Sequence, residues 1–341
     1  MCLNNVPAFA AISNGRDTPS YFNPCPRSRV VFQEVRSMRP IVPHVAPTWV
    51  SAAIALGISA LGCGEPAAPA LPSDEVAYRS LVDGALYLMH ADGSGRRRIW
   101  SSTDDGVMCP SWSPDGSAIA FHKFIANQIV VLTIATGQEH QLTSGPDQSQ
   151  CPMWSPDGTR IAFFRIAATD TQGYPLFVMG ADGTNPTRLG TGTFMADRGS
   201  WSPDGRSIAA SRYPDNQIVL VDAVSGATGL PLTSGSGGRG PSWSPDGRRI
   251  TFNVQEGASE FIDVMDADGA NVRRLTSSPF LDQYPVWTLD GRVITFHRYQ
   301  NSSIPGVLLA SLHMVRLDGT AVPWTVGDSA QGDLPIWRPH R

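Results

Sequence analysis

A five-residue motif, Trp-Ser-Pro-Asp-Gly, recurs four times and constrains the fold more than any other feature of the chain. Proline presets the second position of a tight turn, Asp suits the third, and Gly takes the left-handed position of a hairpin loop. Three residues after the Gly an apolar segment such as Ile-Ala-Phe begins, which is typical of a half-buried strand. Each copy therefore predicts strand, turn, strand, with the Trp packed as an apolar plug between neighbouring units. Full copies begin at Trp112, Trp154, Trp201 and Trp243, and degenerate copies at Trp287 and Trp337.

The spacing of these tryptophans averages 45 residues, the length of one four-stranded propeller blade. In each unit the Trp ends one strand, the Trp strand, and the second strand follows the turn. Near residue 76 lies a second strand with no Trp strand before it, and residues 334–337 form a Trp strand with no second strand after it. Together the two ends complete one blade. The sequence thus predicts an all-β fold over residues 75–341: a six-bladed β-propeller of four-stranded blades, with the ring closed by strands from both termini.

These repeats resemble the WD40-like (PD40) repeats of TolB-type β-propellers, and the resemblance covers about residues 75–341. It implies a periplasmic protein whose propeller binds partner proteins around its central channel. TolB-type proteins also carry an N-terminal α/β domain, whereas here we expect only a short tether before the first blade. The resemblance is therefore to the propeller alone.

The first 74 residues are predicted to be a leader and a tether. Residues 1–37 lack periodicity and are expected to be a non-native upstream extension or disordered, with translation starting at Met38. Residues 38–62 have a basic start and an apolar run that is shorter than the about 20 residues of a membrane span, which is typical of a signal peptide. Residues 63–74 form a Pro/Ala-rich tether.

The segment Ala-Leu-Gly-Cys that ends at Cys63 resembles the lipobox of bacterial lipoproteins, although its Leu stands one place late. The resemblance implies lipidation of Cys63 and a protein lipid-anchored to the envelope membrane, in the periplasm or at the cell surface. The alternative is an ordinary signal peptide with an incidental Cys. Residues 63–341 hold 21 basic and 28 acidic residues, a formal net charge of −7, which excludes a nucleic-acid partner.

A charged rim is expected where the loops into the Trp strands meet the loops that follow the second strands, because surface loops on a rigid scaffold carry most binding residues. We predict that this channel-mouth face binds a protein or peptide partner. The alternative is that these are solvated loop ends with local ion pairs. The predicted partner-binding residues are Lys123, Arg165, Arg198, Arg212, Arg239, Arg298, Asp147, Asp197, Asp282 and Asp333.

A binding protein is favoured over an enzyme, and we expect a monomer with no catalytic residues, metal or cofactor. Neither a Gly-x-Ser-x-Gly elbow nor a P-loop lysine is present. The alternative is a metal-dependent polysaccharide lyase or hydrolase, since some propellers of this type resemble oligogalacturonate lyases, which use a metal and His residues. His122 and His297 hold equivalent positions in two units and are the histidines such a site would use.

Cys109 and Cys151 each stand three residues before a Trp, in adjacent predicted blades. An exported domain permits a disulfide between them, provided that their Cα atoms lie within about 7 Å. We expect two free buried thiols.

Overall fold

The computed structural model describes residues 75–167, 172–277, 279–301, 308–322 and 332–339. The chain divides into two units, Met1–Pro69 and Ala70–Arg341, and all described residues belong to the second. The predicted extension, the signal peptide, the tether and Cys63 lie outside the described residues. Within the described segments, no helix is long and apolar enough to span a membrane.

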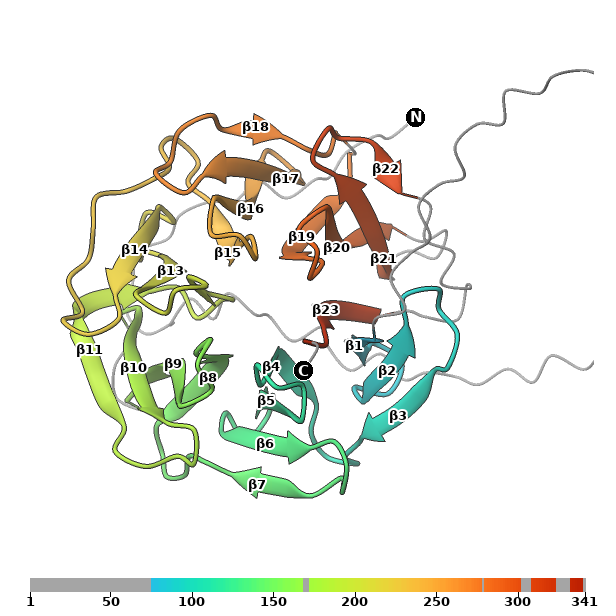
Figure 1. Cartoon of the computed structure of the whole chain (residues 1–341), viewed down its shortest axis with the longest axis vertical. Helices are drawn as coiled ribbons and strands as arrows, with labels where there is room; N and C mark the ends of the chain where they lie inside the picture. Colours follow the sequence, from blue (N-terminus) through green and yellow to red (C-terminus); the bar gives the residue numbers. More distant parts are fainter. Residues whose placement is uncertain (1–74, 168–171, 278, 302–307, 323–331, 340–341) are drawn as a thin grey trace, which may run out of the picture. The chain divides into compact units, whose positions relative to one another are not determined.

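Strands of five sheets follow one another around a central axis (Figure 1). The first sheet consists of β23 (Gly332–Trp337), β1 (Glu75–Ser80), β2 (Leu86–His90) and β3 (Arg97–Trp100). The second consists of β4 (Val107–Trp112), β5 (Ala118–Lys123), β6 (Ile129–Thr133) and β7 (Glu139–Gln141). The third consists of β8 (Gln148–Trp154), β9 (Arg160–Ile166), β10 (Tyr174–Gly180) and β11 (Thr187–Phe194). The fourth consists of β12 (Ser200–Trp201), β13 (Ser207–Ser211) and β14 (Ile218–Asp222).

The fifth sheet has eight strands. They are β15 (Arg239–Trp243), β16 (Arg249–Glu256), β17 (Ser259–Asp266), β18 (Arg273–Arg274), β19 (Leu281–Trp287), β20 (Val293–Asn301), β21 (Leu308–Arg316) and β22 (Ala321–Val322). Its two halves join where β17 pairs in parallel with β19, at Glu260 and Leu281.

The all-β propeller is confirmed, but the predicted division into six four-stranded blades is wrong. The described residues form five sheets, and four of these have four or more strands. Each motif copy specifies one hairpin. It does not determine whether strands of neighbouring hairpins also pair and so merge two sheets into one. Nor does it ensure a fourth strand: after β14, in place of the fourth strand of a four-stranded blade, the described chain forms only an isolated bridge from Thr228 to Val221.

The predicted pairing of the two chain ends is confirmed. β23 runs antiparallel to β1, with Trp337 opposite Val76 and Ile336 opposite Ala77. The next sheet holds this junction as well, because Trp112 Nε1 donates to the Ile336 carbonyl at 3.3 Å. Strands from both ends of the described chain therefore share one sheet, which leaves no unpaired edge between first and last strands.

The Trp-Ser-Pro-Asp-Gly turn forms as its residue types predict. In the first copy Ser113 Oγ donates to Asp115 Oδ1 at 2.7 Å, and the same oxygen accepts the Ser117 N–H at 3.0 Å. Gly116 has φ +66° and donates its N–H to the Ser113 carbonyl at 2.9 Å. A Cβ added to Gly116 would lie 2.7 Å from the Pro339 carbonyl, so this turn needs glycine for space as well as for conformation.

Motif tryptophans pack against the preceding repeat unit, as predicted. Trp201 Nε1 donates to the Met153 carbonyl on β8 at 3.1 Å. Trp287 Nε1 donates to the Ser242 carbonyl on β15 at the same distance. Both rings are buried with apolar residues of the flanking strands. These motif tryptophans thus stabilise the junction with the preceding hairpin.

Candidate functional site

The strands that carry the motif tryptophans border the central axis, and we call β4, β8, β12, β15, β19 and β23 the inner strands. Most are kinked three residues before the Trp, where the pairing register shifts at a residue in the left-handed region. A proline follows, which a bulge tolerates because its missing N–H breaks no ladder bond. The kinked pairs are Cys109-Pro110, Cys151-Pro152, Gly240-Pro241, Tyr284-Pro285 and Leu334-Pro335.

The third motif copy has Arg198-Gly199 in place of a kinked pair. A Cβ added to Gly199 would lie 2.8 Å from both the Ala209 carbonyl and the sulfur of Met153, so the chain passes too closely for a larger residue. The recurring proline two residues before each Trp, broken only here, is the sequence signal that would have distinguished Arg198 from the other charged residues.

A central cavity of about 330 Å³ lies between the inner strands. Its lining begins at the kinked residues Cys109, Cys151 and Gly240 and at the corresponding residue Arg198. It ends at the motif turns, with residues such as Pro114 and Pro156. Among the described residues, none that precedes the kinks on β4 or β8 lines this space. The cavity therefore belongs to the end of the sheets that carries the motif turns, which we call the turn end. The opposite end, with the predicted charged rim, is the loop end.

Arg198 reaches across the axis. It is only 9% exposed, and its Nη1 and Nη2 donate to the carbonyls of Pro335 and Leu334 at 3.3 and 3.2 Å. Those carbonyls are 137 and 136 residues away in sequence, on an inner strand separated from β12 by two other inner strands in either direction. The Tyr284 ring lies 6.0 Å from its guanidinium carbon. A buried cation thus stands at the inner end of the cavity.

Asp197 and Arg239 meet beside this cation, on adjacent sheets. Arg239 Nε lies 3.6 Å from Asp197 Oδ2, which also accepts the Gly240 N–H at 3.3 Å. Burial raises the pKa of Asp197 to about 6, although the charge of Arg239 acts in the opposite direction. Burial also raises the pKa of Glu260, whose carboxylate accepts a hydrogen bond from Asn253 at 2.7 Å.

Asp282 and Arg298, both predicted rim residues, form a second ion pair, within one hairpin. Arg298 donates from Nε and Nη2 to the two oxygens of Asp282 at 2.6 and 2.8 Å, and the carboxylate is fully buried. Such a two-point contact fixes the β19–β20 hairpin.

The other predicted site residues have local partners rather than a common centre. Lys123 Nζ lies 2.6 Å from Glu139 on the outer strand β7. Arg165 donates to Ser149 Oγ at 3.1 Å and stacks on the Phe163 ring, and burial lowers its pKa. Asp147 contributes its carbonyl, which accepts from Gln128 Nε2 at 2.9 Å. Asp333 stands opposite Arg79 in the β1–β23 register, and its side chain lies outside the described residues.

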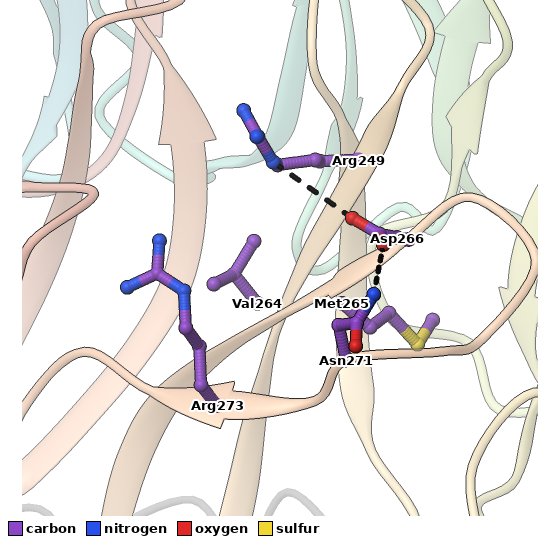
Figure 2. Close-up of a pocket in the computed structure, with 6 residues that line it drawn as sticks. All are labelled: Arg249, Val264, Met265, Asp266, Asn271 and Arg273. Carbon is purple, nitrogen blue, oxygen red and sulfur yellow. Dashed lines mark hydrogen bonds and ion pairs between the residues drawn. The ribbon is translucent and has the colours of Figure 1, made fainter.

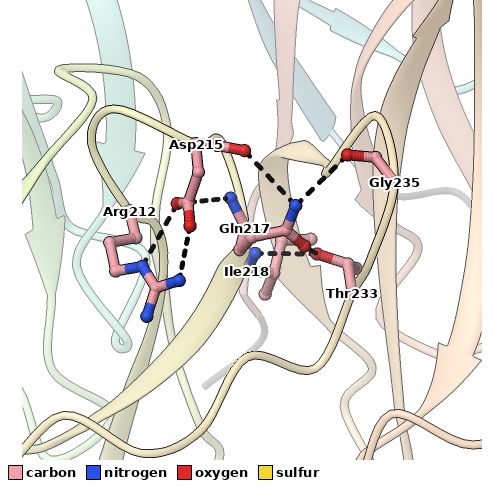
Figure 3. A network of polar contacts seen from close by, with 6 residues as sticks. All are labelled: Arg212, Asp215, Gln217, Ile218, Thr233 and Gly235. Carbon is pink, nitrogen blue, oxygen red and sulfur yellow. Dashed lines mark hydrogen bonds and ion pairs between the residues drawn. The ribbon is translucent and has the colours of Figure 1, made fainter.

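Arg212 pairs with Asp215 in the loop after β13, as Figure 3 shows. The same loop end is tied to the next segment by a polar network: Thr233 Oγ1 donates to Gln217 Oε1 and accepts the Ile218 N–H, each at 2.9 Å. An equivalent network links Gln128, Ile129 and Thr143 in the second sheet. These bonds hold the rim loops in place.

Cys109 and Cys151 form a disulfide with Cα atoms 4.8 Å apart, so the expectation of two free thiols is wrong. Cys109 and Cys151 lie at the kinks of the neighbouring inner strands β4 and β8, and the kinks bring their side chains together. Sequence spacing alone does not reveal this contact. His122 Nδ1 accepts the Cys151 N–H at 3.1 Å, and burial lowers the pKa of His122 to about 3.

These three side chains are the one group of metal-ligand type found in the part of the chain described, with ligand atoms within 4.8 Å of one another. Both sulfurs are bonded to each other, so the thiolates that a metal would need are not available in this state. His297 does not belong to this group. It is buried, with Nε2 3.2 Å from Gln283 Oε1 and the rings of Tyr284 and Tyr299 on either side.

A second cavity, of about 260 Å³, lies at the turn end of the fifth sheet (Figure 2). Arg249 and Arg273 line it from β16 and β18, and Asp266 lies between Arg249, at 3.9 Å, and Asn271, whose amide donates to it at 2.6 Å. Arg249 and Asp266 are paired at the surface, where a single ion pair contributes little stability, and Arg273 donates to the Leu317 carbonyl.

Comparison with known proteins finds relatives among TolB proteins and other proteins. Residues 76–340 match the family model described as the TolB beta propeller domain, PD40. The Tol-Pal system protein TolB of Anaeromyxobacter dehalogenans (strain 2CP-1 / ATCC BAA-258) is 40% identical over 89 residues, covering 26% of this chain and 20% of that protein. The matched segment thus spans one fifth of the length of this relative. The uncharacterized protein Atu1656 of Agrobacterium fabrum (strain C58 / ATCC 33970) is 31% identical over 173 residues, covering 48% and 58%.

Solved structures show the same fold. TolB from Acinetobacter baumannii superposes with a TM-score of 0.64 at 22% identity, covering 79% of this chain and 68% of that one. An oligogalacturonate lyase in complex with manganese superposes with a TM-score of 0.51 at 14% identity, covering 74% and 78%. At such identities the likeness is one of fold alone. The family model, in contrast, covers most of the sequence and all the motif copies, so the chain belongs to the TolB beta propeller domain family.

Proposed function

We propose that this protein is a binding scaffold of the cell envelope, which captures a protein partner on its loop end. The observation that carries the proposal is a group of exposed apolar side chains on neighbouring loops, which we call the apolar patch. They are Val82, Phe124 and Ile125, which are 72, 45 and 67% exposed. Exposed apolar side chains that are grouped on a surface mark interaction sites, whereas single scattered ones are common on any protein. The matched Tol-Pal system relatives support a partner that is itself a protein of the envelope.

The loops that carry this patch are bonded to one another. The Val107 N–H donates to the Gly84 carbonyl at 3.3 Å, and the Phe124 N–H donates to the Gly106 carbonyl at 2.9 Å. Asp105 Oδ1 accepts the Ile125 N–H at 2.6 Å. These bonds connect the first and second sheets at the loop end, so the patch is presented in one arrangement. A preformed surface lowers the entropic cost of binding.

Two rim cations share the loop end with the patch. Lys123 directly precedes Phe124, and Arg212 lies in the corresponding loop two sheets further on. Both are paired locally with carboxylates, and both remain partly exposed, at 24 and 34% of their side chains. Such rim charges steer an acidic partner and set its orientation more than they add affinity.

The location in the envelope is also a proposal. It is supported by the lipobox-like segment at Cys63 and by the disulfide between Cys109 and Cys151, since disulfides persist in exported proteins. Labelled palmitate should be incorporated by the wild-type chain and lost with Cys63→Ser. Incorporation that survives this substitution would place the anchor elsewhere. Light scattering of the purified propeller should give the mass of a monomer.

The binding test uses cross-linking in intact cells followed by capture of the propeller. We expect one cross-linked partner with the wild type and its loss with Phe124→Asp/Ile125→Asp. Lys123→Glu/Arg212→Glu should weaken the capture. The matched control is Val272→Asp, which places the same charge on an apolar side chain that is 52% exposed at the turn end. Equal loss with the control, or unchanged capture with the patch variant, would contradict the proposed surface.

A further inference from the structure

The central cavity offers a binding site at the end of the propeller opposite the proposed partner surface. Its volume of about 330 Å³ is within the range of about 300–1,000 Å³ that is common for ligand pockets. It can hold a short stretch of extended peptide, but not a folded domain. What could bind there follows from its wall and from its inner end.

The wall is apolar and rigid. Proline and tryptophan side chains of successive inner strands alternate around it, including Pro110, Trp112, Pro152 and Trp154. Prolines and buried tryptophans have few rotamers to lose, so they contact a ligand at little entropic cost. Such a wall favours apolar side chains.

The inner end is cationic. Arg198 lines the cavity, and its guanidinium bonds to the carbonyls of Pro335 and Leu334. The neighbouring charges are Asp197 and Arg239, which face each other at 3.6 Å. A planar guanidinium binds a carboxylate through two parallel hydrogen bonds that are roughly twice as strong as bonds to neutral carbonyls. A carboxylate that reaches this point would therefore compete well with the two carbonyls.

We propose that Arg198 is the carboxylate receptor of the central cavity, and that the cavity takes an acidic peptide whose carboxylate lies between apolar residues. The peptide enters from the turn end, and its carboxylate replaces the carbonyls of Leu334 and Pro335 on the guanidinium. The source of the carboxylate is either an acidic side chain or the C-terminus of a partner, which share this chemistry.

The probes are three short peptides with the purified propeller: acetyl-Ala-Leu-Glu-Leu-Ala-amide, the same peptide with Gln in place of Glu, and the Gln peptide with a free C-terminal carboxylate. Binding is followed by calorimetry and by tryptophan fluorescence. We expect the Glu peptide to bind at least about ten-fold more tightly than the Gln peptide, the gain of one charge-assisted contact. A stronger gain with the free carboxylate would identify a chain terminus as the source.

Two Arg198 variants and a matched control complete the test. Arg198→Met should abolish the Glu-over-Gln preference, and Arg198→Lys should keep part of it, because the charge remains without the planar fork. The control is Arg188→Met: that guanidinium also bonds to two carbonyls, of Gly190 and Thr191, but on the exposed strand β11. Its preference should equal that of the wild type.

Equal binding of the Glu and Gln peptides by the wild type would overturn the inference, as would a preference that survives Arg198→Met. If Arg198→Met does not fold, the Lys variant and the wild-type preference still decide. The inference does not rest on the loop-end proposal. Partner capture that depends on Phe124 and Ile125 can succeed without any acidic-peptide preference, and that preference can exist without partner capture.

Discussion

Trp337, in the last described strand, stands opposite Val76, in the first, within one antiparallel ladder. Its ring is buried, and its Nε1 donates to Thr295 Oγ1 on the preceding sheet at 3.2 Å. One side chain therefore holds the pairing of the chain ends against a neighbouring sheet. This position has an energetic consequence that can be measured.

Trp337→Ala is expected to lower the free energy of unfolding by about 3–5 kcal/mol, the usual cost of emptying a buried aromatic site. The matched control is Trp154→Ala, because that motif Trp is only half-buried on β8. Urea unfolding followed by circular dichroism gives both values. A cost for Trp337 no larger than that for Trp154 would show that the junction of the chain ends contributes no special stability.

The disulfide between Cys109 and Cys151 joins residues 42 apart, a loop length for which the chain-entropy relation gives about 4 kcal/mol of stability. Cys109→Ser/Cys151→Ser should lose stability of that order, and reduced wild type should match the variant. Thiol titration of the denatured chain should find two more thiols with reductant than without. If reductant changes neither the thiol count nor the stability, the two sulfurs are not joined in solution.

The buried pair of Asp282 and Arg298 should behave unlike the exposed pair of Arg212 and Asp215. Arg298→Ala leaves a fully buried carboxylate without its cation and should cost about 3–5 kcal/mol. Arg212→Ala removes a pair at the surface and should cost less than about 1 kcal/mol. Thermal unfolding of the two variants tests the contrast. Similar costs would mean that the Asp282 carboxylate is hydrated in solution.

Local residue chemistry explains how much of this molecule could be predicted. The turn at Ser113 to Gly116 forms as expected because all its determinants lie within five residues. The pairing of Val76 with Trp337 could also be predicted, since two half-units of one repeat complete each other. The sheet count could not, because the pairing of Glu260 with Leu281 depends on how one loop lies against the next strand.

The site was harder to predict for the same reason. The repeat pattern was enough to predict Asp197 and Arg239 on one rim, but not that the two side chains meet. Nor did it show that Arg198 reaches across the axis. The reach of Arg198 depends on the absence of the kink from this copy and on the small Gly199. The disulfide likewise depends on left-handed backbone at Cys109 and Cys151, with φ of 45° and 47°. Such long-range geometry leaves only indirect traces in a sequence, such as the interrupted proline pattern.

His122 provides a test at low pH. Burial, reinforced by the charge of Arg79 and opposed by Asp105, lowers its pKa to about 3, against 6.5 for an exposed histidine. The folded protein therefore resists a proton that the unfolded chain accepts. The contribution of His122 to the free energy of unfolding is fully present above pH 6.5. As the pH falls towards 3, this contribution is lost at up to about 1.4 kcal/mol per pH unit.

His122→Asn removes this titration while an amide oxygen can still accept the Cys151 N–H. Its stability should therefore fall less than that of the wild type between pH 6.5 and 4, in urea unfolding at matched salt. Asp197, with its raised pKa, and Asp157, with a pKa lowered to about 2 by its bonds to Ser155 and Thr159, titrate in both proteins and cancel in the difference. Parallel pH profiles would mean that His122 is accessible to protons in the folded state.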